Sequence, residues 1–192
     1  MRYLRIVCEG LDYKNIDLTL MDFIEDFPAE YNAQKRAMFN RHNIALKKFW
    51  KTPSTQLVDS FGAPDGPTPD ISLWSYGCLF LSPRATRFLE DSLKAQGELL
   101  PIEIGNEIWS LYNCLTFYPS EKVTVTTYKS GASEGLVKSI KFEPIKNFNA
   151  SIFKAHATIG RHLYCSQNLA NAIASFELDG VDFTEKLVET FE

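Results

Sequence analysis

The stretch LFLSPRATRFLEDSLKAQGELLPIEI, residues 79–104, contains the signals of a strand, a helix and a second strand in succession. Its first apolar residues continue those before them and predict a buried strand over 73–81. Ser82 and Pro83 follow, and these residue types favour the N-cap and the first position of a helix. Gly97 is the expected end of that helix. The apolar residues expected on its buried face are Phe88, Leu89 and Leu93.

The same order of signals recurs further along the chain. Residues 162–165 predict a strand and Ser166 an N-cap, and Gly180 stops the following helical segment before a short strand over 181–183. Two explanations stay open: an internal duplication, or two uses of a common way to build an α+β unit. The residues expected inside the second helix are Leu169, Ile173 and Phe176.

Strands dominate the remainder of the sequence. The alternation of Val123, Val125 and Thr127 is typical of a half-buried sheet. The connector SGASEG, residues 130–135, predicts a flexible hairpin loop. Its glycines are only a weak signal of a phosphate cradle, because the spacing of a phosphate-binding loop is absent. The expected strands are 3–8, 56–61, 99–104, 108–117, 122–128 and 136–142. We therefore expect an α+β fold with a mainly antiparallel sheet, two shorter Ser-capped helices and one long N-terminal helix.

The long helix is predicted between residues 29 and 51, which contain no Gly or Pro. Apolar positions recur there at steps of three and four residues, and Pro53 follows as a stop. The turn-forming run GAPDGPTPD, residues 62–70, is a loop or a joint. We expect a single domain over 1–192, with this joint separating a variable part, 1–61, from the rest, 71–192. The inner face of the helix is expected to carry Met38, His42, Ala45 and Phe49.

The composition is that of a folded domain with a mildly acidic surface. The 192 residues are 45% hydrophobic and 13% aromatic, which excludes global disorder. The net charge of -4 argues against binding to a phosphate backbone as the main activity and favours a basic partner. No apolar run approaches the roughly 18 residues of a membrane span, and no signal peptide is evident. We therefore expect a cytoplasmic protein that has no membrane partner.

Four cysteines lie far apart, without the close pairs of metal sites and redox motifs. In a reducing cytoplasm they are expected to be free, buried thiols, with a disulfide as the alternative. They are Cys8, Cys78, Cys114 and Cys165.

No combination of residues predicts catalysis or metal binding. His42, His156 and His162 have neither HxH nor HExxH spacing. The adjacent acidic pairs 25–26 and 90–91 would point in different directions on helices. We expect no catalytic residues, no cofactor and no metal.

Charge is strongly segregated in the first 51 residues. Residues 9–30 carry seven acids and one base, whereas residues 33–51 carry six bases and no acid. This pattern has three explanations. The two segments pair with each other or are both simply solvated, the bases steer a protein partner, or the bases bind nucleic acid. The candidate partner-binding residues are Lys35, Arg36, Arg41, Lys47, Lys48, Trp50, Asp65 and Asp70.

Short motifs follow one another in a fixed order from residue 69 to residue 183. They are Pro69-Asp70, LFLSPRATRFLE (79–90), ELLPIEI (98–104), LYNCL (111–115), IFK (152–154), LYCS (163–166) and LDGVDF (178–183). This order resembles the bacterial immunity-protein eleven family, whose members are found beside polymorphic toxins and secreted effectors. Residues 1–60 lie outside the resemblance.

The resemblance implies a role and supplies no catalytic residue. An immunity protein holds a cognate toxin inactive in the producing cell or its kin, by stoichiometric binding. A domain without a catalytic set suits that role, because an inhibitor needs only a complementary surface. The alternatives are a nucleic-acid-associated module that uses the basic helix at 33–51, and a hydrolase whose site is assembled from distant residues.

Overall fold

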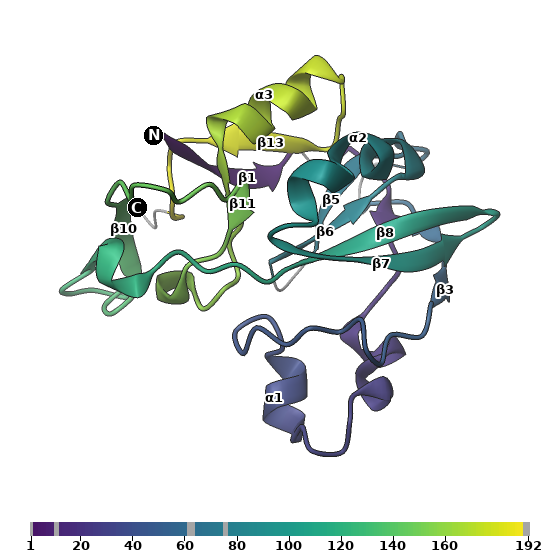
Figure 1. Cartoon of the computed structure of the whole chain (residues 1–192), viewed down its shortest axis with the longest axis horizontal. Coiled ribbons are helices and arrows are strands. Elements are labelled where there is room, and N and C mark those ends of the chain that lie inside the picture. The colour runs from purple at the N-terminus through teal and green to yellow at the C-terminus, as the bar shows by residue number, and fades with distance from the viewer. Residues whose placement is uncertain (1, 10–11, 61–63, 75–76, 190–192) are drawn as a thin grey trace.

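The computed structural model describes residues 2–9, 12–60, 64–74 and 77–189, which form an α+β protein built on two main sheets (Figure 1). The five-stranded sheet has the order β3 (Ser54–Thr55), β7 (Gly97–Ile104), β8 (Glu107–Cys114), β6 (Cys78–Leu81), β5 (Ile71–Trp74). The four-stranded sheet has the order β11 (Ile152–Phe153), β12 (Tyr164–Ser166), β1 (Tyr3–Cys8), β13 (Val181–Thr184). All pairings are antiparallel except that of β3 with β7.

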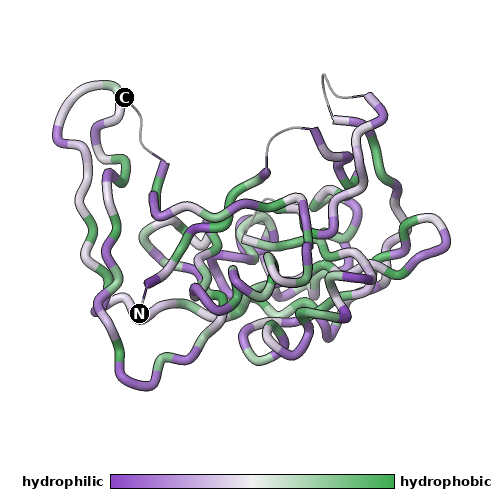
Figure 2. Tube along the Cα trace, turned by 90° about the horizontal axis from the view of Figure 1, so that it is seen from above, coloured by the Kyte–Doolittle hydropathy of each residue, from purple (hydrophilic) through white to green (hydrophobic). Residues whose placement is uncertain are grey.

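Two further strand pairs and the helices complete the described chain. β9 (Val123–Thr127) and β10 (Val137–Phe142) form a hairpin at one end of the molecule, where polar and apolar residues alternate along the trace (Figures 1 and 2). β2 (Asn15–Ile16) pairs with β4 (Leu57–Val58). The α-helices are α1 (Ala33–Ala37), α2 (Pro83–Leu93) and α3 (Gln167–Ser175). The 3-10 helices are Leu20–Asp22, Ile24–Asp26, Ser120–Lys122 and His156–Thr158.

The repeated order of signals corresponds to two units of the same topology. In the first unit, α2 connects β6 to β7, and β8 lies between these two parallel strands. In the second, α3 connects β12 to β13, and β1 lies between them. Each unit also has an antiparallel edge strand, β5 beside β6 and β11 beside β12. We call them the first and second split units; the inserted strand follows the first unit in the chain and precedes the second.

Both predicted serine caps are confirmed. The Ala85 N–H donates to Ser82 Oγ at 3.0 Å, and the Leu169 N–H donates to Ser166 Oγ at 3.3 Å. The predicted helix faces are only partly right, because Phe88 and Phe176 are each 37% exposed. Their rings stack on each other with centroids 4.4 Å apart, so these two side chains join α2 to the end of α3 at the surface.

The core has three parts. The first lies between the two main sheets and the helices α2 and α3, which cover them from the same side (Figure 1). The second lies on the opposite face of the five-stranded sheet, where the chain from Ile16 to Trp50 packs. The third joins the β9–β10 hairpin to β1, β11 and β12 through a group of aromatic rings that includes Tyr3, Tyr118 and Phe153.

The long N-terminal helix predicted over 29–51 is wrong. Only α1, five residues long, is helical, and the chain then turns and continues as irregular structure that packs on the sheet (Figure 1). α1 ends at Ala37, and after the turns that follow it Asn43 takes a left-handed conformation, φ +53°, which is incompatible with a continuing helix. The buried residues are therefore Phe39, Asn40, Ile44 and Leu46, while His42 and Ala45 of the predicted inner face are exposed.

Other expectations need smaller corrections. The strand predicted over 73–81 is two strands, β5 and β6, which pair with each other, and residues 75 and 76 lie outside the described chain. Gly97 is the first residue of β7 and not a helix stop. The predicted strand 56–61 is strand only at β4, and position 61 lies outside the described residues. The cysteines are free thiols, three of them buried, but Cys8 is exposed.

Candidate partner-binding surface

The predicted basic residues separate into exposed and internal groups. Arg36 is partly buried: its guanidinium donates to the carbonyl oxygens of Tyr31 at 2.6 Å and Pro28 at 3.3 Å, so it holds the turn before α1. Lys51, outside the candidate set, pairs with Asp26. The remaining four bases are exposed, and none has an acidic partner among the residues that the structure describes; they are Lys35, Arg41, Lys47 and Lys48. Pairing with residues 9–30 therefore accounts for little of this charge.

The reversal of the chain at Asn43 brings two of these bases to one cavity. It has a volume of about 350 Å³, and Lys35 from α1 and Lys48 from the returning segment both line it, together with Tyr31 and His42. A volume of this size accommodates one or two side chains of a partner. We call this feature the basic pocket; the turn that ends the predicted helix is what creates it.

A buried carboxylate fixes the returning segment to the sheet. Glu98 of β7 accepts hydrogen bonds from the backbone N–H groups of Leu46 at 2.5 Å and Lys47 at 3.1 Å. The side chain of Asn113 on β8 donates to Glu98 at 2.8 Å and to the Ile44 carbonyl at 3.0 Å. These bonds satisfy backbone groups that a helix would otherwise have paired internally. The wall of the basic pocket is thus rigidly attached to the five-stranded sheet.

A buried lysine fixes the other side of the turn. Lys154 is fully buried, its Nζ donates to the Asn40 carbonyl at 2.8 Å, and it lies 4.7 Å from the centre of the Phe117 ring. Burial lowers the pKa of Lys154 below its usual value, because the charged form loses hydration. The Asn40 side chain in turn donates to the Gly160 carbonyl at 3.1 Å. In the sequence Lys154 ends the short motif IFK (152–154), which gives no sign of this role.

Three other predicted candidates do not join the pocket. Trp50 is half-buried; its indole N–H donates to the Pro101 carbonyl at 2.9 Å and its ring packs on Phe23, 5.1 Å between centroids. Asp65 is exposed at a turn with φ +60°. Asp70 accepts from Ser82 at 2.7 Å and pairs with an arginine, as described next. The structure gives Trp50 and Asp70 stabilising contacts within the chain.

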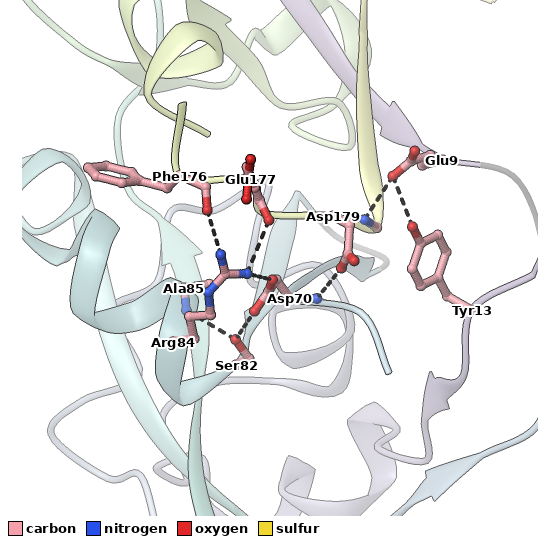
Figure 3. A network of polar contacts seen from close by, with 10 residues as sticks. Glu9, Tyr13, Asp70, Ser82, Arg84, Ala85, Phe176, Glu177 and Asp179 are labelled. Atoms are coloured by element: carbon pink, nitrogen blue, oxygen red, sulfur yellow. Dashed lines mark hydrogen bonds and ion pairs between the residues drawn. The ribbon is translucent and has the colours of Figure 1, made fainter. Parts of the chain in front are cut away.

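Asp70 belongs to a polar network that joins the two split units (Figure 3). Arg84, near the start of α2, donates to Asp70 at 2.5 Å and to the carbonyls of Phe176 at 2.6 Å and Glu177 at 3.1 Å, after the end of α3. Asp179 accepts from the Asp70 N–H at 3.0 Å. A cavity of about 530 Å³ adjoins this network; Asp70, Ser82, Arg84 and Asp179 all line it, and they already bond within the network.

The described chain contains no group of three or more His, Cys, Asp or Glu side chains that could hold a metal ion. Among its helices none is both long and apolar enough to cross a membrane.

No family model matches the sequence, and no curated protein is found to be similar to it.

Proposed function

We propose that this protein is a cytoplasmic immunity protein, which binds a cognate toxin stoichiometrically and holds it inactive. The observation that carries the proposal is the basic pocket: two exposed bases without acidic partners in the described chain, Lys35 and Lys48, line a cavity whose wall is fixed to a sheet. A preformed surface of this kind loses little conformational freedom when a partner binds. The order of motifs from residue 69 to residue 183 adds the resemblance to immunity proteins.

The charge of the pocket selects an acidic partner surface. The whole chain carries a net charge of -4, so the bases of the pocket form a local positive region on an acidic protein. A local positive region accelerates encounter with a negative patch and orients it, and this effect weakens as salt increases. We therefore infer that the toxin presents carboxylates toward Lys35 and Lys48. This differs from the basic partner that the net charge of this protein alone favoured.

The nucleic-acid alternative loses its main structural element. A recognition helix must be long enough to lie in the major groove with several residues facing the bases. α1 has only five residues, and the bases beyond it lie on irregular chain. We therefore prefer a protein partner. The hydrolase alternative has two short motif matches, GxSxG at 131–135 and SxxK at 151–154. The first lies in the connection between β9 and β10 and not between a strand and a helix, and Lys154 of the second donates to the Asn40 carbonyl.

Charge reversal of the basic pocket tests the proposal. The partner that copurifies with the chain from its native cell is isolated, and its binding is measured by stopped-flow mixing. The double substitution Lys35→Glu and Lys48→Glu should slow association about tenfold at low salt and leave the melting temperature nearly unchanged, since both side chains are exposed. The salt dependence of association should fall with it.

The matched control reverses two exposed lysines elsewhere, Lys129→Glu and Lys141→Glu, near and on the β9–β10 hairpin. An equal loss in the control would show that only net charge matters and would remove the basic pocket from the proposal. Titration of the isolated toxin should show an equivalence point at one chain per toxin. Protection at far below equimolar amounts would instead identify an enzyme.

A further inference from the structure

A second cavity, remote in sequence from the basic pocket, has a cationic wall. It has a volume of about 390 Å³ and is lined by Arg5 of β1 and by Arg161 and His162, which precede β12. Arg5 pairs in register with Tyr164 and Thr184, so it lies at the centre of the four-stranded sheet. Leu4 and Ile6 point to the core under α3, and side chains alternate along a strand, so Arg5 occupies the opposite face.

Arg5 is buried with a donor left unused. The residue is only 9% exposed, and its Nε is a buried atom without a hydrogen-bond partner. The one carboxylate within ion-pair range in the described chain is Glu189, at 3.6 Å from an Nη atom, which is longer than a charge-assisted hydrogen bond. A buried guanidinium with unsatisfied donors is costly, so it indicates a site made for an acceptor that is not part of the sheet.

His162 supplies a second unused polar atom beside Arg5. Its Nδ1 is buried and has no hydrogen-bond partner. The charged groups that face it are Arg5, Arg161 and Glu189. Burial lowers the pKa of His162 below its usual value, and the nearby charge of Arg5 lowers it further. The ring is therefore neutral near pH 7.

Part of the cavity wall is apolar. Val7, Leu73 and Trp74 line it. An adjoining cavity of about 180 Å³ shares Arg161, His162 and Glu189 with it and adds apolar side chains, among them Ile159. Ile159 is 42% exposed and has φ +57°, which is rare for a β-branched residue and recurs at binding sites. The ligand must therefore combine a negative group with an apolar one.

The chain itself shows which kind of molecule fits this face. The segment that follows β13 crosses it as a peptide: the Tyr164 hydroxyl donates to the Leu187 carbonyl at 3.0 Å, Val188 is buried, and the Glu189 carboxylate approaches Arg5. The Glu189 side chain is nevertheless 65% exposed and bonds loosely. We propose that this cavity binds the C-terminal carboxylate of a peptide whose last residue is apolar, with Glu189 as a weak internal competitor. This inference is independent of the proposed function.

The test uses the whole chain labelled with ¹⁵N and the peptide acetyl-Ala-Ala-Leu as free acid and as amide. The free acid should shift the resonances of Arg5, His162 and Trp74 and saturate, and the amide should bind at least tenfold more weakly. Equal binding of acid and amide, or no shift at these residues, would overturn the proposal. Octanoate is the third probe: if it binds and the peptide acid does not, the assignment to a peptide is wrong.

Three variants locate the binding to this cavity. Glu189→Gln should tighten binding of the peptide acid several-fold, because the competing charge is gone, and Arg161→Gln, at an exposed position, should weaken it. Arg5→Gln should abolish it, with the amide spectrum showing that the sheet remains folded. Arg2→Gln is the control, since Arg2 is an exposed base that pairs with Glu185. Weaker binding in Glu189→Gln, or unchanged binding in Arg161→Gln, contradicts the model.

Binding should also depend on pH with a definite sign. A bound carboxylate favours protonated His162, so the ring takes up a proton as the peptide binds. Because the pKa of His162 in the free protein lies below its usual value, affinity should rise as the pH falls from 8 toward about 5.5, where a peptide carboxylate is still ionised. His162→Gln should remove this dependence. Affinity that falls with decreasing pH in the parent protein would contradict the assignment.

Discussion

Replacing Gly180 with alanine is expected to lower the free energy of unfolding by about 3–5 kcal/mol, a loss at the upper end for single substitutions. Gly180 has φ +96°, which strains any residue with a side chain. An added Cβ would lie 2.2 Å from the Ile71 carbonyl oxygen and 2.6 Å from Pro69 Cβ. Both sides of the contact are fixed, since the Gly180 N–H donates to Glu9 at 3.0 Å and the Ile71 N–H donates to the Asp179 carbonyl at 2.9 Å.

Gly105→Ala separates the steric effect from the effect of the backbone conformation. Gly105 also has a positive φ, +60°, but nothing lies within 4 Å of its added Cβ. In this control the free energy of unfolding should fall by about 1–2 kcal/mol, which is the cost of placing a residue with a side chain in the left-handed conformation. Urea unfolding of both variants measures the difference. Losses of equal size would mean that the contact of Gly180 with β5 gives way easily, and that the two split units are not tightly joined there.

Glu98→Ala is the second substitution with a large expected effect, a loss of about 3–4 kcal/mol in the free energy of unfolding. It removes the acceptor of three donors, the N–H groups of Leu46 and Lys47 and the side chain of Asn113. Leaving a buried donor without a partner costs about 1–3 kcal/mol each, and relaxation of the segment recovers part of the sum. Chemical denaturation measures the loss, and hydrogen exchange should show faster opening at Leu46 and Lys47 than in the parent protein.

The same substitution links stability to the proposed function. Because Glu98 holds the returning wall of the basic pocket, Glu98→Ala should weaken toxin binding although it leaves all the pocket's bases in place. Glu103→Ala is the matched control, an exposed carboxylate on the same strand, and should change stability by less than about 0.5 kcal/mol. Unchanged exchange at Leu46 in Glu98→Ala would show that hydrophobic packing alone holds the segment.

Local signals in the sequence predicted the local features of the fold. The first strand matches the prediction residue for residue, and both predicted caps, Ser82 and Ser166, are confirmed. The prediction of a helix over 29–51 was wrong because it also rested on local signals alone. These were the absence of Gly and Pro and the helical spacing of a few apolar residues. Long-range hydrogen bonds outweighed helix propensity there: Asn40 donates to the Gly160 carbonyl, and Glu98 accepts from the Leu46 N–H.

The candidate site was predictable in part for the same reason. The excess of bases at 33–51 marked the right segment, and their exposure follows from their charge. Which of them share a cavity depends on the turn at Asn43, which the pattern did not predict. Glu98 had a usable signal, since it shares its strand face with Leu100, Ile102 and Ile104 and is therefore a charged residue at an inward position. Arg5 and His162 meet only through sheet register, which no short motif encodes.

The insertion of β1 between β12 and β13 has a consequence for the order in which the protein assembles on the ribosome. The strands of the first split unit are neighbours in the sequence, so that unit is complete once β8 has been synthesised. The second unit cannot form until β13 has been synthesised, and until then the backbone groups of β1 lack their partners. The Gly180 N–H, for example, donates to Glu9, 171 residues away in the sequence. Pairing over such a distance is slow because the entropy of closing the loop is lost first. The exposed edges of a newly made β1 are therefore the part of the nascent chain most in need of a chaperone.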